Sequence, residues 1–210
     1  MNNTKYSREA IINKRKYRPD ILGDELSLYI SNYPQAAKHL IKKIKGKGNS
    51  VVELCCGIGV TLELLADNFP SVIGVDIDNQ VLIYCDKNLQ TAGLRNKVTL
   101  VQGDINQEEV LKNIKADLVI YDIPYWNIGL TENTGLDQKN PKLEEIIHKI
   151  RHLITKNIVI FSAPHFTKQM ADHVLGENEF EEIYINGKHD RNYIYLGELA
   201  ANNVKKEIEL

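Results

Sequence analysis

The 210-residue sequence has three cysteines, one tryptophan and no long hydrophobic run. Two of the cysteines are adjacent, so the sequence provides neither a disulfide framework nor the paired C-x-x-C ligands of a zinc site. No stretch approaches the roughly 18 apolar residues of a membrane-spanning helix. The first twenty residues are too polar for a signal peptide. We therefore expect a cytoplasmic protein with no membrane segment and no metal site.

The charge is nearly balanced overall but unevenly distributed. The net charge is −2, yet residues 1–50 hold eleven Lys or Arg against four Asp or Glu, a balance of +7, which leaves −9 for the remainder. A basic segment on a near-neutral protein indicates a polyanionic partner, although solvated helical faces would give the same pattern. The candidate contacts are Lys14, Arg15, Lys16, Arg18, Lys42, Lys43, Lys45 and Lys47.

From residue 50 onward, short apolar strands alternate with amphipathic helices, a pattern typical of a parallel sheet covered on both faces. The predicted parallel strands are Val51–Cys55, Val72–Val75, Val98–Gln102, Leu118–Tyr121 and Ile158–Phe161. The predicted helices are Gln35–Ile44, Thr61–Phe69, Val81–Ala92, Gln107–Ile114, Leu143–Ile154 and Lys168–Leu175. The fold class is therefore α/β, with helices on both sides of the sheet.

Two further strands, Phe180–Asn186 and Asn192–Leu196, lie too close in sequence for a parallel crossover and must form an antiparallel hairpin. The sheet then has seven strands. Residues 1–48 have too few apolar side chains for a core of their own, so we interpret them as a helical extension. Residues 49–200 form the main domain, and 201–210 a C-terminal tail.

A glycine turn directly follows the first strand. Glu53 lies near its end, and Cys55 precedes Gly57 and Gly59, where the absence of a side chain lets the backbone approach a ligand. The dinucleotide fingerprint requires a third glycine, but Leu62 occupies that position, which disfavours NAD. The adjacent cysteines are interpreted as small residues beside the turn, because neighbouring cysteines bridge poorly.

Acidic residues end the next two strands. Asp76 can accept hydrogen bonds from ribose hydroxyls, and Asp104, after Gly103, can accept one from an adenine amino group. Ile77 and Ile105 could then enclose the adenine ring. Each residue could instead serve only its own turn, but together they occupy successive carboxyl ends of strands, the ligand-binding edge of an open α/β sheet.

These residues resemble the class I S-adenosylmethionine-dependent methyltransferases. Glu53, Gly57 and Gly59 correspond to motif I, Asp76 and Asp104 to the ribose and adenine acids, and Asp122-Ile123-Pro124-Tyr125 to motif IV. The resemblance implies a Rossmann-like, seven-stranded sheet with an antiparallel end, S-adenosylmethionine as cofactor, S-adenosylhomocysteine as product and no metal.

Motif IV resembles the tetrad of enzymes that methylate exocyclic base amines. Asp122 and the carbonyl of Ile123 would accept hydrogen bonds from the amine and align its lone pair with the methyl group. Pro124 stiffens the turn, and Tyr125, with Trp126 beside it, would stack on the base. The alternative is that both aromatic residues belong to the core. The polar segment Asn127–Lys142 suits a substrate-facing lid.

Over about residues 17–199 the sequence is similar to the trimethylguanosine synthase family, also called RNA cap guanine-N2 methyltransferases. The similarity includes motif I, Gly74-Val75-Asp76-Ile77-Asp78 and the segment from Tyr195 to Leu199. It departs from the family at motif IV, where the family has Ser-Pro-Pro-Trp. It also has Ser162-Ala163-Pro164-His165 in place of a Pro-Arg-Asn turn, which disfavours cap recognition.

The leading hypothesis is an S-adenosylmethionine-dependent RNA methyltransferase acting on guanine N2. The alternatives are adenine-N6 methylation of DNA or RNA, which the acidic Asp122 would suit, and a non-catalytic module that binds the cofactor and RNA. An NAD oxidoreductase is a distant alternative.

Overall fold

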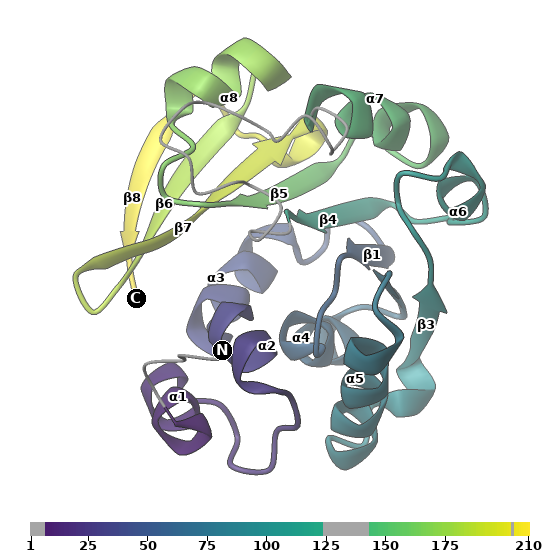
Figure 1. The fold of residues 1–210 in the computed structure, drawn as a ribbon. Helices are drawn as coiled ribbons and strands as arrows, with labels where there is room; N and C mark the ends of the chain where they lie inside the picture. The colour runs from purple at the N-terminus through teal and green to yellow at the C-terminus, as the bar shows by residue number, and fades with distance from the viewer. Residues whose placement is uncertain (1–6, 124–142, 203) are drawn as a thin grey trace.

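An eight-stranded sheet organises the computed structural model, which describes residues 7–123, 143–202 and 204–210 (Figure 1). The strand order is β3-β2-β1-β4-β5-β7-β6-β8. The strands are β1 (Ser50–Leu54), β2 (Ser71–Asp76), β3 (Val98–Gln102), β4 (Leu118–Asp122), β5 (Ile158–Ser162), β6 (Glu179–Ile185), β7 (Lys188–Leu196) and β8 (Lys205–Glu209). The predicted α/β class and the antiparallel C-terminal hairpin are confirmed, but the sheet has eight strands where seven were predicted.

The first five strands are parallel, so their carboxyl ends meet at one edge of the sheet. In register, Leu54 of β1 lies between Val75 of β2 and Tyr121 of β4. The residues that follow these three positions therefore converge, including Asp76 and Asp122. Strand β7 is antiparallel to both β5 and β6.

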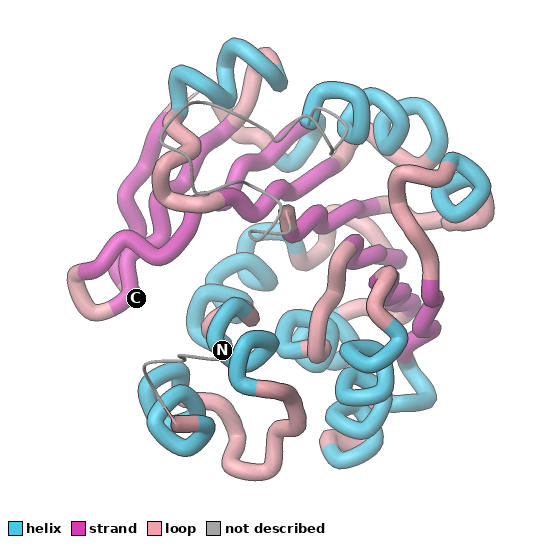
Figure 2. Tube along the Cα trace, in the orientation of Figure 1, coloured by secondary structure: helices cyan, strands magenta, loops and turns pink. Residues whose placement is uncertain are grey.

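Helices cover both faces of the sheet (Figures 1 and 2). One face carries α3 (Pro34–Ile44), α4 (Val60–Asn68) and α5 (Asn79–Thr91), and the other carries α6 (Glu108–Lys112), α7 (Leu143–Leu153) and α8 (Lys168–Leu175). Helix α7 shows why: Leu143, Ile146, Ile147 and Ile150 recur at helical spacing and are all buried. Short 3₁₀ turns, η1 (Arg95–Lys97) and η3 (Gly197–Leu199), precede β3 and follow β7.

The C-terminal part differs from the sequence prediction in two places. Asn186 and Gly187 both have positive φ, 52° and 71°, which is the geometry of a two-residue hairpin turn. Strand β7 therefore begins at Lys188, within the segment predicted as the turn. The residues predicted as a tail form β8, which pairs with β6 in parallel and becomes an eighth strand.

The N-terminal residues form α1 (Arg8–Arg15) and α2 (Glu25–Ile30) ahead of α3. Their apolar side chains share a cluster with Ile58 of the loop that follows β1 and Val60, the first residue of α4: Ile11, Ile12 and Leu28 pack with both. The glycine turn is thus held between the sheet and the N-terminal helices. None of the described helices is long and apolar enough to cross a membrane.

Candidate active site

The glycine turn between β1 and α4 is tight. Gly57 and Gly59 have φ of +57° and +88°, and Cys55, a non-glycine residue, has φ of +61°. A Cβ atom at Gly59 would lie 2.6 Å from Sγ of Cys85 on α5. Both the backbone conformation and the close packing therefore require glycine at position 59.

Asp76, at the end of β2, holds this turn in place. Its Oδ2 accepts a hydrogen bond from the Gly57 amide at 2.9 Å, and its Oδ1 accepts one from the Asp78 amide at 3.0 Å. Asp78 in turn caps α5 by accepting from the amides of Gln80 and Val81. Burial raises the pKa of Asp76 above its ordinary value, although the backbone amides oppose the shift.

Glu53, on β1, is 2% exposed and lines a cavity at the carboxyl edge of the sheet. Its Oε2 has no hydrogen-bond partner among the described residues. Burial, followed by the charge of Asp122, raises the pKa of Glu53 well above its ordinary value. A buried carboxylate oxygen without a partner is costly, so Oε2 is suited to a cationic ligand group.

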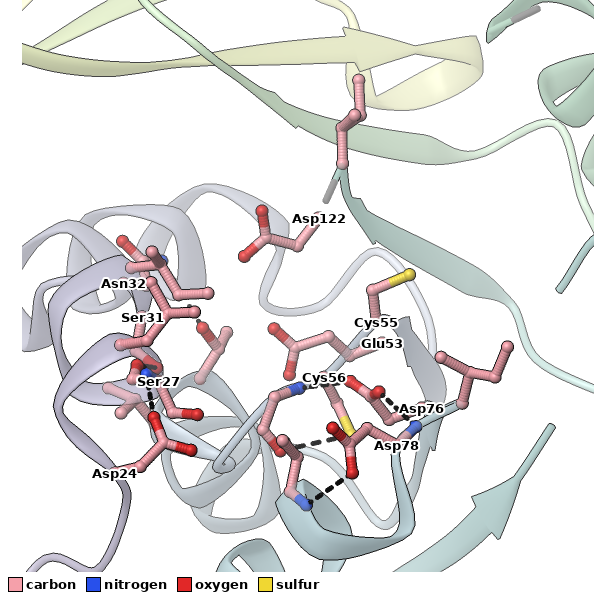
Figure 3. Close-up of a pocket in the computed structure, with 18 residues that line it drawn as sticks. Asp24, Ser27, Ser31, Asn32, Glu53, Cys55, Cys56, Asp76, Asp78 and Asp122 are labelled. Carbon is pink, nitrogen blue, oxygen red and sulfur yellow. Dashed lines mark hydrogen bonds between the residues drawn. The ribbon is translucent and has the colours of Figure 1, made fainter. Parts of the chain in front are cut away.

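Asp122 ends β4 and its carboxylate extends into the cavity (Figure 3). Its Oδ1 is buried with no partner among the described residues, and its Oδ2 lies 4.0 Å from Nη1 of Arg191 on β7. Burial raises the pKa of Asp122 to about 7, and the positive charge of Arg191 opposes that rise. The residue is therefore a hydrogen-bond acceptor that titrates near neutral pH.

These groups line one cavity of about 400 Å³. The acidic residues around it are Asp24, Glu53, Asp76, Asp78 and Asp122, and no Lys, Arg or His is among the described residues that line it. A negative cavity favours a cationic ligand and disfavours one that carries a pyrophosphate. The cavity thus fits a sulfonium compound with an α-amino group better than it fits NAD.

The predicted cofactor residues divide into two groups. Glu53, Cys55, Gly57, Asp76 and Ile77 line the cavity, and the side chain of Ile77 is 62% exposed. Gly59, Gly103, Asp104 and Ile105 are outside the lining; Gly59 caps α4, Asp104 accepts from the Asn106 amide, and Ile105 is buried in the core.

The predicted catalytic segment is described only in part. Asp122 and Ile123 line the cavity, and the Ile123 amide donates to the Phe161 carbonyl at 3.3 Å. Pro124, Tyr125 and Trp126, with the segment 127–142, lie outside the described residues. Their predicted roles in stiffening the turn, stacking on the base and covering the substrate remain predictions.

One wall of the cavity comes from the N-terminal helices, which the sequence did not indicate. Asp24, Leu26, Ser27, Ile30, Ser31 and Asn32 all line it. Asn32 is 2% exposed, and its amide donates to the Tyr193 hydroxyl of β7 at 2.9 Å. The only local signal was Asp24, an N-cap that accepts from the Ser27 amide at 2.7 Å.

Long-range polar contacts hold this wall against the glycine turn. The buried Asn88 of α5 donates to the carbonyls of Leu22 and Ile58, each at 2.9 Å, and accepts from the Leu22 amide at 2.7 Å. Arg18 pairs with Glu63 of α4 at 3.0 Å. Side chains on α4 and α5, together with Tyr193 of β7, therefore set the position of the N-terminal wall.

Some side chains of the basic segment, residues 1–50, form ion pairs within the protein. Arg18 pairs with Glu63, and Lys43 pairs with Glu179 and Glu181 at 2.6 and 2.8 Å. Because glutamates balance their charges, Arg18 and Lys43 add little positive charge to the protein surface. Among the described residues, no group of three His, Cys, Asp or Glu side chains could hold a metal ion.

Comparison with known proteins finds one matching family model and several methyltransferases of similar sequence. Residues 48–198 match the family described as RNA cap guanine-N2 methyltransferase. The chain is 30% identical over 96 residues to the rRNA N(6)-adenosine-methyltransferase metl-5 of Caenorhabditis elegans, which covers 44% of each chain. It is 35% identical over 80 residues to the U6 snRNA (guanine-N(2))-methyltransferase THUMPD2 of Bos taurus, which covers 37% of this chain and 16% of that protein.

The fold also matches solved structures. An RNA methyltransferase from Salinibacter ruber, in complex with S-adenosyl-L-homocysteine, superposes with a TM-score of 0.54 over 80% of this chain and 95% of that one, at 14% identity. At this identity the match concerns the fold alone. The matched segments cover less than half of either curated relative.

Proposed function

The chain belongs to the RNA cap guanine-N2 methyltransferase family, and from this premise we propose that it transfers a methyl group from S-adenosylmethionine to guanine N2 in RNA. The observation that carries the proposal is the buried Asp122 Oδ1, an acceptor without a described partner in the same acidic cavity as Glu53 and Asp76. Such an acceptor is what an exocyclic N–H requires.

Some residues of the cavity would bind the cofactor, and others would orient the amine that receives the methyl group. Asp76 would accept from the ribose hydroxyls while it keeps the Gly57 turn in place, and Glu53 would balance the charge of the α-amino group. When bound, the cofactor supplies an electrophilic methyl group on a sulfonium. The acidic lining favours that positive charge before transfer.

The remaining step belongs to Asp122 and Ile123. An exocyclic amine is a weak nucleophile because its lone pair is delocalised into the ring. An ionised Asp122 accepts one N–H and the Ile123 carbonyl accepts the other, which turns the lone pair toward the methyl group. As the nitrogen gains the methyl group it becomes cationic, and its surplus proton leaves through Asp122, whose pKa near 7 suits proton transfer at neutral pH.

Adenine N6 is the second candidate acceptor. The similarity to an rRNA adenosine-N6 methyltransferase and the acidic first residue of motif IV both favour it. The chemistry assigned to Asp122 is the same for either amine, because both are exocyclic and conjugated.

Transfer of a tritiated methyl group onto size-fractionated cellular RNA tests the proposal. Nucleoside mass spectrometry of the product should show N2-methylguanosine. Detection of N6-methyladenosine alone would favour the second candidate. Absence of transfer to every RNA fraction, with cofactor binding intact in calorimetry, would contradict the proposed activity and support a non-catalytic binding module.

A further inference from the structure

A second cavity, of about 230 Å³, lies between the N-terminal helices and the β6–β7 hairpin. We refer to it as the hairpin cleft. The helices contribute Lys14, Arg15, Tyr29 and Tyr33 to its lining, and the hairpin contributes Lys188 and Asp190. Nothing in the proposed transfer chemistry uses these side chains.

The charge of the hairpin cleft is opposite to that of the catalytic cavity. Three of its lining residues are basic: Lys14, Arg15 and Lys188. Its one acidic side chain, Asp190, accepts from Nε of Arg191 at 2.8 Å and is thereby neutralised. The cleft therefore presents net positive charge, which favours an anionic ligand.

Aromatic rings accompany this charge. The Arg15 guanidinium lies 4.3 Å from the ring centroid of Tyr33 and 5.4 Å from that of Tyr29, and Nη1 donates to the Ser31 carbonyl at 2.5 Å. Arg15 and Tyr33 are buried, but Tyr29 is 45% exposed. An exposed aromatic ring beside fixed cations is the arrangement by which proteins stack an unpaired base and hold its phosphate.

Two elements, α2 and β7, connect the hairpin cleft with the catalytic site. On α2, Tyr29 lines the cleft while the next residue, Ile30, lines the catalytic cavity. On β7, Asp190 lines the cleft while Arg191 lies 4.0 Å from Asp122. The pairing of β6 and β7 shifts register at this point, because Ile183 faces Arg191 and Tyr184 faces His189, leaving Asp190 as the extra residue of a bulge.

The size of the cleft limits its ligand. Sites for complete small-molecule ligands usually measure about 300–1,000 Å³, and this cleft is smaller. It suits one part of a longer ligand, whose remaining parts occupy the neighbouring catalytic cavity.

We propose that the hairpin cleft binds the nucleotide next to the target base in a single-stranded RNA. The base stacks on Tyr29, and Lys188 holds the phosphate. This inference rests on the proposed function, and it assigns to the N-terminal helices and the hairpin a joint role in RNA selection.

Fluorescence anisotropy with a labelled single-stranded RNA 10-mer, one central guanosine among uridines, tests the proposal in the absence of cofactor. Tyr29→Ala should weaken RNA binding roughly 5- to 150-fold, as expected for one stacked base, and Tyr29→Trp should restore it. Lys188→Ala should reduce the slope of log affinity against log salt by about 0.7. Lys115→Ala is the matched control. This exposed lysine precedes β4, at the amino-terminal ends of the parallel strands, whereas the catalytic cavity lies at their carboxyl ends.

A second readout locates the nucleotide directly. With 4-thiouridine placed beside the guanosine, ultraviolet crosslinking should label the peptide that contains Tyr29, and Tyr29→Ala should remove the label. Calorimetry should give the same affinity for S-adenosylmethionine in all four variants.

The outcomes separate this inference from the proposed function. RNA binding that depends on Tyr29 and Lys188, without methyl transfer to any RNA, would support the cleft and contradict the activity. Methyl transfer with RNA affinity and salt slope unchanged in both variants would overturn the cleft, as would failure of the wild-type protein to bind the 10-mer. Displacement of RNA by polyglutamate with no effect of Tyr29→Ala would assign the cleft to an acidic protein instead, and would also overturn it.

Discussion

Arg191 of β7 places Nη1 4.0 Å from Oδ2 of Asp122 at the end of β4, and only 3% of the Arg191 side chain is exposed. The two residues come from strands that are not adjacent, since β5 lies between β4 and β7. The guanidinium therefore reaches Asp122 from across the carboxyl edge of the sheet. Burial and the charges of Asp190 and Asp76 raise the pKa of Asp122, and the positive charge of Arg191 lowers it.

This relationship predicts how methyl transfer depends on pH. Transfer requires an ionised Asp122, so the rate should rise through pH 7 in the wild-type protein. Arg191→Met removes the positive charge and should move this rise upward by about 1–3 pH units, whereas Arg191→Lys should move it less. Single-turnover rates across pH, at saturating cofactor, provide the measurement. An unchanged midpoint in Arg191→Met would show that Arg191 does not act on Asp122.

Asp122→Asn should separate binding from transfer. Methyl transfer should fall at least about 100-fold, because the acceptor that orients the amine is weakened. Cofactor affinity in calorimetry should stay close to that of the wild type, since Glu53 and Asp76 are retained. Equal transfer rates for the two proteins would place the acceptor elsewhere.

The same substitution should stabilise the protein at high pH. In the folded state the pKa of Asp122 is about 7, against about 4 in an unfolded chain. Between these values the folded state binds more protons, so the free energy of unfolding decreases as pH rises. Removing the carboxylate removes this loss. The stability advantage of Asp122→Asn in urea titrations should therefore grow by about 2.5 kcal/mol from pH 5 to pH 8, and a constant advantage would contradict the shift.

The glycine turn provides a matched pair of substitutions. Gly59→Ala introduces both a strained φ and a Cβ atom 2.6 Å from Sγ of Cys85. Gly93→Ala has a similar φ, +72°, but its Cβ would meet nothing within 4 Å. We expect Gly93→Ala to cost about 1 kcal/mol with unchanged cofactor affinity, and Gly59→Ala to cost more and weaken cofactor binding at least tenfold. Thermal unfolding and calorimetry measure the two effects, and equal behaviour of the variants would contradict the close-packing argument.

Asn88 should have the largest stabilising role among the contacts of the N-terminal wall. Asn88→Ala removes the partner of the buried Ile58 carbonyl and of the partly buried amide and carbonyl of Leu22, so we expect a loss of about 2–3 kcal/mol. Asn113→Ala is the control, because that exposed amide bonds only a local carbonyl, Glu109, at 2.7 Å. Urea titrations compare the two variants. Equal losses would show that Asn88 does not fix the wall.

The sequence pattern predicted the five parallel strands well because most residues in each of them are apolar. Strand β3 and helix α8 have the predicted bounds, Val98–Gln102 and Lys168–Leu175. Strand β8 was missed because its sequence, KKEIE, is polar and mostly exposed. An edge strand of this kind is defined by backbone pairing with β6, which leaves no alternating apolar pattern.

The sequence predicted those site residues that lie at the carboxyl ends of strands. Glu53, Asp76 and Asp122 lie at strand ends and all line the cavity. Asp24 and Asn32 reach the same cavity through docking of the N-terminal helices, which depends on partners as distant as Asn88 and Tyr193. No local pattern encodes such contacts, so residue-by-residue interpretation cannot place this wall.

The hydrogen bond between Asn32 and Tyr193 has a consequence for biosynthesis. The two residues are 161 positions apart, and Asn32 contributes to the wall of the catalytic cavity. During translation the N-terminal helices emerge from the ribosome long before β7 is made. A nascent chain arrested before position 193 therefore lacks one of the partners that hold this wall, and the full set of contacts around the catalytic cavity forms only after β7 has been made.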